Sequence, residues 1–196
     1  MNPLVHHLVT MAHNNAWANH RLLGAAATLD HAAFVAPRTG FFPSIMATLN
    51  HNLTVDWFYV AAIERGIAGL PVDPDGRRYF DPELPFDACG PLATAQREVD
   101  ARLIAVCRGL HDDDLARTVA IPWRSGVAHE TTVRVLAHLF EHQIHHRGQA
   151  HAMLSGTAVA PPQLDEFFCA NDAPLRAADF AELGWTESMI WDPPRG

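Results

Sequence analysis

Histidines whose spacing suits metal binding are concentrated in one stretch of this 196-residue sequence. Five of the thirteen histidines fall between residues 131 and 156, namely His138, His142, His145, His146 and His151. In a helix, His142 and His146 lie one turn apart and project from the same face, with His138 one turn earlier on that row. Two imidazoles on a mostly apolar helical face can hold a divalent transition metal between packed helices.

The spacing of this pair is also compatible with a purely structural role. An HxxxH pattern arises by chance in a chain rich in histidine, and core or surface imidazoles can simply hydrogen-bond backbone carbonyls. Zinc usually has at least three protein ligands, so the pair is one ligand short. His51 lies close to the apolar stripe of an expected helix over residues 44–66. It is a candidate for the third ligand, although a lone histidine in this position is more often a core residue.

Four helices are expected to position these histidines. Apolar residues recur at helical spacing over residues 3–29, 44–66 and 91–109, and from Thr131 or Thr132 to about residue 156. Residues 67–90 are rich in proline and glycine, which predicts a long crossover loop. Alternation over residues 118–123, followed by Ser125 and Gly126, predicts a short extended or hairpin-like segment rather than a sheet. We also expect Gly66 to end the second helix, and short helical turns near residues 163–170 and 177–183. The predicted fold class is all-α, a four-helix bundle with one long crossover.

Composition narrows the classes of function. Fourteen lysines and arginines against 22 aspartates and glutamates give a net charge of −8, and no basic run occurs, which argues against nucleic-acid binding. Cys89, Cys107 and Cys169 are an odd number without CxxC spacing, as expected of reduced thiols. The first residues lack the pattern of a secretory signal, and no stretch approaches the roughly 20 apolar residues of a membrane span. We therefore expect a cytoplasmic protein that does not cross a membrane.

Several segments together resemble the DinB family of helical proteins, a damage-inducible group related to bacterial thiol S-transferases. They are HNNAWANHRLL at 13–23, FFPSIMATLNHNLTVDWFY at 41–59, HLFEHQIHHRGQAHAML at 138–154 and PPQLDEFF at 161–168. The resemblance implies a DinB-like four-helix bundle over residues 1–170. Residues 171–196 would then be a C-terminal tail that docks on the bundle or on a partner subunit.

The same resemblance implies a ligand set and a chemistry. The three metal-binding histidines of the family correspond to His51, His142 and His146, and the expected metal is zinc or nickel. Three imidazoles leave an open coordination position, where the metal would activate a low-molecular-weight thiol or a water. The implied function is a metal-dependent thiol S-transferase or hydrolase that acts on an unidentified small molecule. The alternative is a non-catalytic, metal-binding stress-response protein. A homodimer is also implied.

Four further residues are candidates for supporting roles. His13 stands where the family motif usually has an aromatic residue, so it could face the cavity as a proton carrier or weak extra ligand; otherwise it is a hydrogen-bonded histidine. It is the best candidate for a general base. Gln149 could orient a ligand or a water on the metal, or simply fill polar space. Arg147 suits a structural ion pair or a loop anchor more than binding of a substrate anion, and His145 should face solvent or a subunit.

Overall fold

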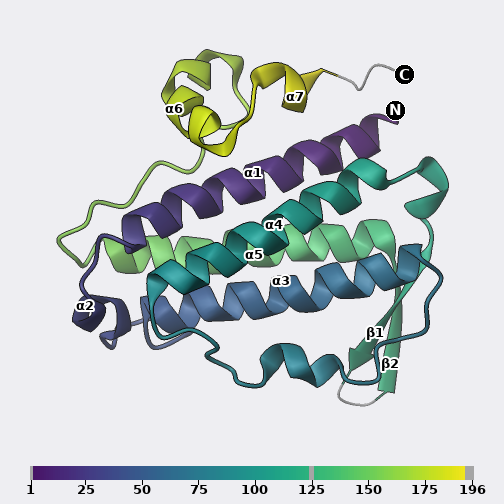
Figure 1. Cartoon of the computed structure of the whole chain (residues 1–196), viewed down its shortest axis with the longest axis horizontal. Coiled ribbons are helices and arrows are strands. Elements are labelled where there is room, and N and C mark those ends of the chain that lie inside the picture. The colour runs from purple at the N-terminus through teal and green to yellow at the C-terminus, as the bar shows by residue number, and fades with distance from the viewer. Residues whose placement is uncertain (1, 124–125, 193–196) are drawn as a thin grey trace.

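Four long helices form the body of the protein in the computed structural model, which describes residues 2–123 and 126–192. They are α1 (Pro3–Ala26), α3 (Ile45–Ile67), α4 (Cys89–Gly109) and α5 (Thr132–Leu154), and they run side by side along the long axis of the molecule (Figure 1). α1 packs mainly against α4, and α3 against α5, around a continuous apolar core. No helix among the described residues is both long enough and apolar enough to cross a membrane.

The expected helical character is confirmed, with a small sheet in addition. β1 (Thr118–Trp123) and β2 (Gly126–Thr131) pair antiparallel, so the segment expected to be extended or hairpin-like is a hairpin, and its two strands form the small sheet that was not expected. Buried Val119 and Ile121 alternate with more exposed residues on β1, which packs against α3. A Cβ added at Gly66 would lie 3.1 Å from the Val119 side chain, so the glycine permits this approach; α3 nevertheless continues through it to Ile67. Ser125, expected in the turn, lies outside the described residues.

Side-chain caps set where several helices begin. The Ser44 hydroxyl accepts a hydrogen bond from the backbone N–H of Ala47 at 3.1 Å and starts α3. The Asp30 carboxylate accepts one from Ala33 at 2.7 Å, which starts the short helix α2 (His31–Val35) in the expected connection. Two 3₁₀ helices lie in the other links, η1 (Gly76–Phe80) within the expected crossover loop and η2 (Asp112–Asp114) before β1.

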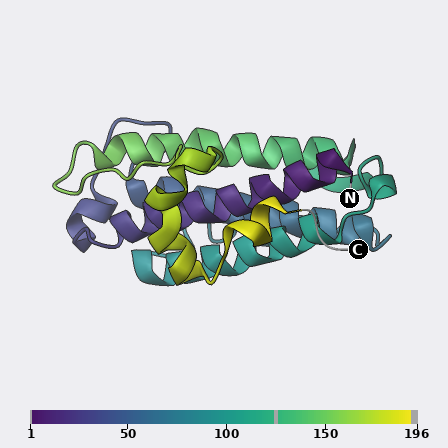
Figure 2. The same ribbon diagram turned by 90° about the horizontal axis from the view of Figure 1, so that it is seen from above.

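The segment after α5 crosses over α1 and forms a second, smaller core there (Figure 2). It contains η3 (Ala170–Asp172), α6 (Ala173–Leu183) and α7 (Glu187–Trp191). Trp17 of α1 is fully buried against Phe167 and Phe180, and its indole N–H donates to Asp179 at 2.9 Å. Arg21 pairs with the same carboxylate at 2.7 Å. Residues 163–170 are irregular up to Ala170, unlike the helical turn expected there, and the second expected turn is part of α6.

A layer of buried polar side chains joins the four long helices. Its members are Asn15 and Asn19 of α1, Asp56 of α3, Gln96 and Asp100 of α4, and Arg147 of α5. Arg147 donates to the side-chain oxygens of Asn15 and Asn19 at 2.8 and 3.1 Å, and both amides donate in turn to Asp100 at 3.1 Å. Arg147 is therefore the buried cation of a network that ties the helices together, and its hydrogen bonds go to amide oxygens rather than to the ion-pair partner that the sequence suggested.

Candidate metal centre

His51, His142 and His146 meet between α3 and α5. One nitrogen of each ring lies within 4.8 Å of those of the other two, and His51 Nε2 is 2.9 Å from His142 Nε2. The three pairs of ring centroids are 4.9, 4.7 and 4.5 Å apart. Helical spacing puts the α5 pair on one face, and the packing of α3 on α5 brings His51 to them. The structure thus brings together the three residues that the resemblance implied.

The surroundings of the three imidazoles disfavour their charged forms. Burial, followed by repulsion from His146, lowers the pKa of His51 to about 4. Burial, together with repulsion from the neighbouring histidines, lowers the pKa of His142 to about 3. Burial also lowers the pKa of His146. All three rings are therefore neutral near pH 7, and protons do not compete for the nitrogen lone pairs that a metal would use.

These lowered pKa values predict an acid-sensitive metal-free protein. A histidine whose pKa is lower in the folded than in the unfolded state stabilises the fold above about pH 6.5, and this contribution is lost as the pH falls towards about 4. We expect the Tm in EDTA to drop more across this range for the wild type than for His142→Gln. Burial raises the pKa of Asp56 and Asp100, which acts in the opposite direction in both proteins, so the difference between them isolates the histidine effect. Parallel pH profiles would contradict the prediction.

Gln149 fixes the orientation of the His146 ring. The Nδ1–H of His146 donates to Oε1 of Gln149 at 2.8 Å, which leaves Nε2 as the nitrogen free to bind a metal. The amide nitrogen of Gln149 donates to the exposed His145 at 3.1 Å. The side chain is thus placed to orient a metal ligand, one of the two roles that the sequence suggested for it.

This contact gives a second prediction. Gln149→Leu is expected to weaken zinc binding by about 10- to 100-fold, because the His146 ring loses the acceptor that holds its tautomer and orientation. Gln149→Glu keeps an acceptor and should bind zinc at least as well as Gln149→Leu does. Competition with a chelating dye measures both affinities. Wild-type affinity in Gln149→Leu would show that the hydrogen bond does not support the site.

An aromatic cover over the histidines was missed by the sequence reasoning. The Phe42 ring centroid lies 4.3 Å from that of His51 and 5.4 Å from that of His146. Phe41 lies 5.9 Å from His146, and 76% of its surface is exposed. The available signal was the position of both rings immediately before Pro43 and the start of α3. These rings shield one side of the site from water.

His13 is not in contact with the three histidines. Its Nδ1 bonds the Val9 carbonyl at 2.7 Å, Arg108 donates to its Nε2 at 3.0 Å, and its ring packs edge-on to Trp185. Burial lowers the pKa of this fully buried ring. Its surroundings are therefore α1, α4 and the tail. The expected role in the metal cavity has no support from these contacts, since both ring nitrogens are already bonded.

Cys89 and Cys107 are not activated nucleophiles. Burial raises the pKa of the Cys89 thiol to about 11 and that of Cys107 to about 12. Both thiols are therefore protonated near pH 7, when a nucleophile must be a thiolate. Neither of these two buried thiols is therefore a candidate nucleophile at the centre.

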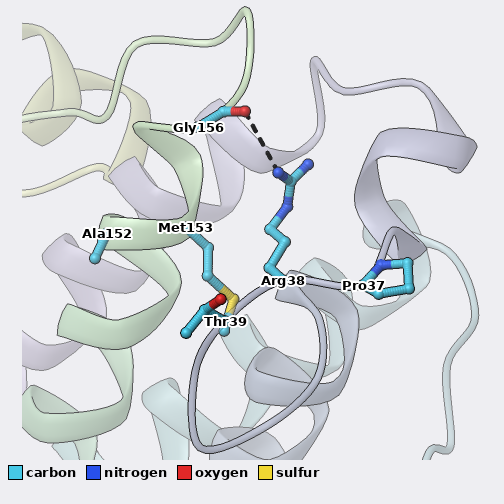
Figure 3. Close-up of a pocket in the computed structure, with 6 residues that line it drawn as sticks. All are labelled: Pro37, Arg38, Thr39, Ala152, Met153 and Gly156. Carbon is cyan, nitrogen blue, oxygen red and sulfur yellow. Dashed lines mark hydrogen bonds between the residues drawn. The ribbon is translucent and has the colours of Figure 1, made fainter.

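Two cavities adjoin α5, and they differ in their relation to the histidines. One, of about 380 Å³, lies between residues 37–39 and the end of α5, where Arg38 donates to the Gly156 carbonyl at 3.4 Å (Figure 3). The three histidines are not among its lining residues. The other, of about 330 Å³, lies beside the hairpin and is lined in part by His138, one helical turn from His142. Only the second therefore borders the row of histidines on α5.

The donor set fits a divalent transition metal. Neutral imidazole nitrogens suit zinc, nickel, copper or iron, and the absence of a carboxylate from the group makes calcium and magnesium poor fits. Among residues 2–123 and 126–192, no fourth histidine, cysteine, aspartate or glutamate belongs to the group. Three ligands leave at least one coordination position open to a small molecule.

Fold and site together define a mostly helical protein whose three-histidine group could hold a metal ion. The sequence profile of the DinB family matches residues 2–176, and the chain belongs to that family. The match covers all four long helices and the hairpin, and it ends within α6, a few residues beyond the expected end of the bundle at residue 170. No curated protein matches the chain.

Proposed function

We propose that this DinB-family protein is a metal-dependent enzyme whose four-helix bundle holds zinc or nickel through His51, His142 and His146. The observation that supports this best is the convergence of three neutral imidazoles without a fourth ligand in the described part of the chain. Structural zinc sites are closed by a fourth protein ligand, whereas catalytic sites keep a position for water or substrate. When bound, the metal would supply Lewis acidity that lowers the pKa of a thiol or a water molecule.

The side chains around the group have distinct tasks in this proposal. Gln149 holds the His146 ring in one tautomer, and Phe42 packs over His51 and His146 and limits the access of water. Along α5, the exposed His138 lies one turn before the half-buried His142. A small molecule would therefore approach the centre from the side of His138. We assign no proton transfer to His13, whose ring nitrogens are both bonded elsewhere.

The reaction that we favour is transfer of a low-molecular-weight thiol to an electrophilic small molecule, with hydrolysis as the neighbouring option. The thiol would bind as an external substrate, and burial keeps Cys89 and Cys107 protonated and unsuited to act in its place. A homodimer remains part of the proposal, and exposed Leu175 and Met189 on the tail would suit a contact between copies. The competing proposal is a non-catalytic protein in which the metal only joins α3 to α5.

Cobalt substitution separates the two proposals, because the visible spectrum of Co²⁺ reports its ligands. We expect the wild type to bind Co²⁺ and N-acetylcysteine to add a sulfur-to-metal charge-transfer band in the near ultraviolet. His142→Ala should show neither signal. If Co²⁺ binds but N-acetylcysteine leaves the spectrum unchanged, the open position does not accept a thiol, and the thiol transfer that we favour is rejected.

A further inference from the structure

The cavity beside the hairpin has walls from three elements. Tyr59 comes from α3, Ile121 and Trp123 from β1, and Val135 and His138 from α5. Its volume of about 330 Å³ falls within the range of small-molecule sites, which is roughly 300–1,000 Å³. The hairpin forms one wall, so the cavity exists because β1 packs across the ends of α3 and α5.

The cavity continues the row of rings that forms the metal centre. The centroid of the His138 ring lies 6.2 Å from that of His142, and the Tyr59 ring packs edge-on to His138 at 5.2 Å. Tyr59 also follows His51 by eight residues, so both lie on the same face of α3. A molecule that contacts His138 in the cavity would thus reach the neighbourhood of the three histidines with its other end.

The walls are apolar and aromatic, and their charges are paired. Glu130 and Arg134 are the charged lining residues, and they form an ion pair with each other at 2.8 Å. Trp123 leaves 60% of its surface exposed, so its indole is available to a ligand. Burial raises the pKa of Tyr59, which keeps the phenol neutral. Within the described residues, neither the Tyr59 hydroxyl nor the Trp123 N–H has a protein hydrogen-bond partner, and both can donate to an oxygen on a bound ring.

We propose that this cavity binds the substrate of the enzyme, and that the substrate carries a flat, uncharged aromatic ring with an oxygen substituent. Stacking and edge contacts with Trp123 and Tyr59 select the ring, and the Tyr59 hydroxyl and the Trp123 N–H select the oxygen by donating to it. Binding of an aromatic ring is independent of the metal, whereas its role as substrate rests on the proposed function.

Titration with 2-naphthol by calorimetry tests the binding site. The metal-free wild type should bind this probe, and Trp123→Ala should weaken binding by at least about tenfold through loss of one aromatic wall. Phe168→Ala, which removes an exposed aromatic side chain of the tail, is the matched control and should bind as the wild type does. Absence of binding to the wild type, or an equal effect of both substitutions, would overturn the proposal.

A second experiment measures how close the bound 2-naphthol lies to the metal. In the Co²⁺-loaded protein, we expect faster relaxation of the 2-naphthol protons than in the Zn²⁺-loaded protein, and slower relaxation once Trp123→Ala weakens binding. Equal relaxation in both metal forms, with binding intact, would place the ring away from the centre and reject its role as substrate. The response of the cobalt spectrum to N-acetylcysteine does not depend on 2-naphthol, so failure of the cavity and failure of the metal centre give different results.

Discussion

Replacing His142 with alanine is expected to weaken zinc binding by more than about 100-fold, since residues that merely support a metal ligand already contribute about 10- to 100-fold. His142 Nε2 lies 2.9 Å from His51 Nε2, and its ring is central to the row on α5. Its removal leaves only two imidazoles, which is fewer than a stable zinc site normally has. Competition with a fluorescent zinc chelator at neutral pH measures the change.

The matched control for this prediction is His151→Ala on the same helix. His151 bonds the Pro162 carbonyl at 2.8 Å and is not part of the three-histidine group, so its loss should leave zinc affinity almost unchanged. Similar zinc affinities for His142→Ala and His151→Ala would show that the metal binds elsewhere. Circular dichroism of both variants should match the wild type at neutral pH. His142 is only half-buried, and its low pKa leaves the ring uncharged, so its replacement by alanine removes no charge from the metal-free fold.

Replacing Arg147 with methionine is expected to lower the free energy of unfolding by about 3–5 kcal/mol, the usual effect of removing one partner from a buried charged network. Arg147 is 5% exposed and provides the positive charge beside the buried carboxyl groups of Asp56 and Asp100. Methionine keeps much of the volume but leaves Asp100 without a compensating charge and Asn15 and Asn19 without a donor. Urea unfolding at neutral pH measures the loss.

Two comparisons isolate the electrostatic cause. Arg147→Met combined with Asp100→Asn should recover part of the stability, because the uncompensated carboxylate is gone. Arg134→Met, on the same helix, removes an exposed ion pair with Glu130 and should change stability by less than about 1 kcal/mol. If Arg147→Met unfolds at the same urea concentration as Arg134→Met, the buried network does not depend on its cation.

The helical periodicity of apolar residues predicted most of the helices. The four long helices lie within a few residues of the expected spans, because apolar spacing and caps such as Ser44 act within one or two turns of the chain. The elements that differ from the expected ones depend on a local cap or on pairing between strands. The Asp30 cap forms α2 inside an expected connection, and pairing between β1 and β2 makes a two-stranded sheet of the segment expected to be extended or hairpin-like.

The facing pair His142 and His146 follows from local sequence alone, since an i, i+4 spacing places two residues on one face of a helix. His51 was one candidate for the third member, and the resemblance selected it, because that residue is 91 positions away from His142 and only the packing of α3 on α5 brings them together. The packing of the helices also determines the surroundings of side chains whose roles the local pattern left open. It placed His13 against Arg108 and Trp185, buried Arg147 among the polar side chains, and formed the hairpin cavity beside His138. Local sequence predicts a helix and its faces because helix periodicity depends on residues a few positions apart. It does not predict the surroundings of a side chain, because these depend on which helices pack together.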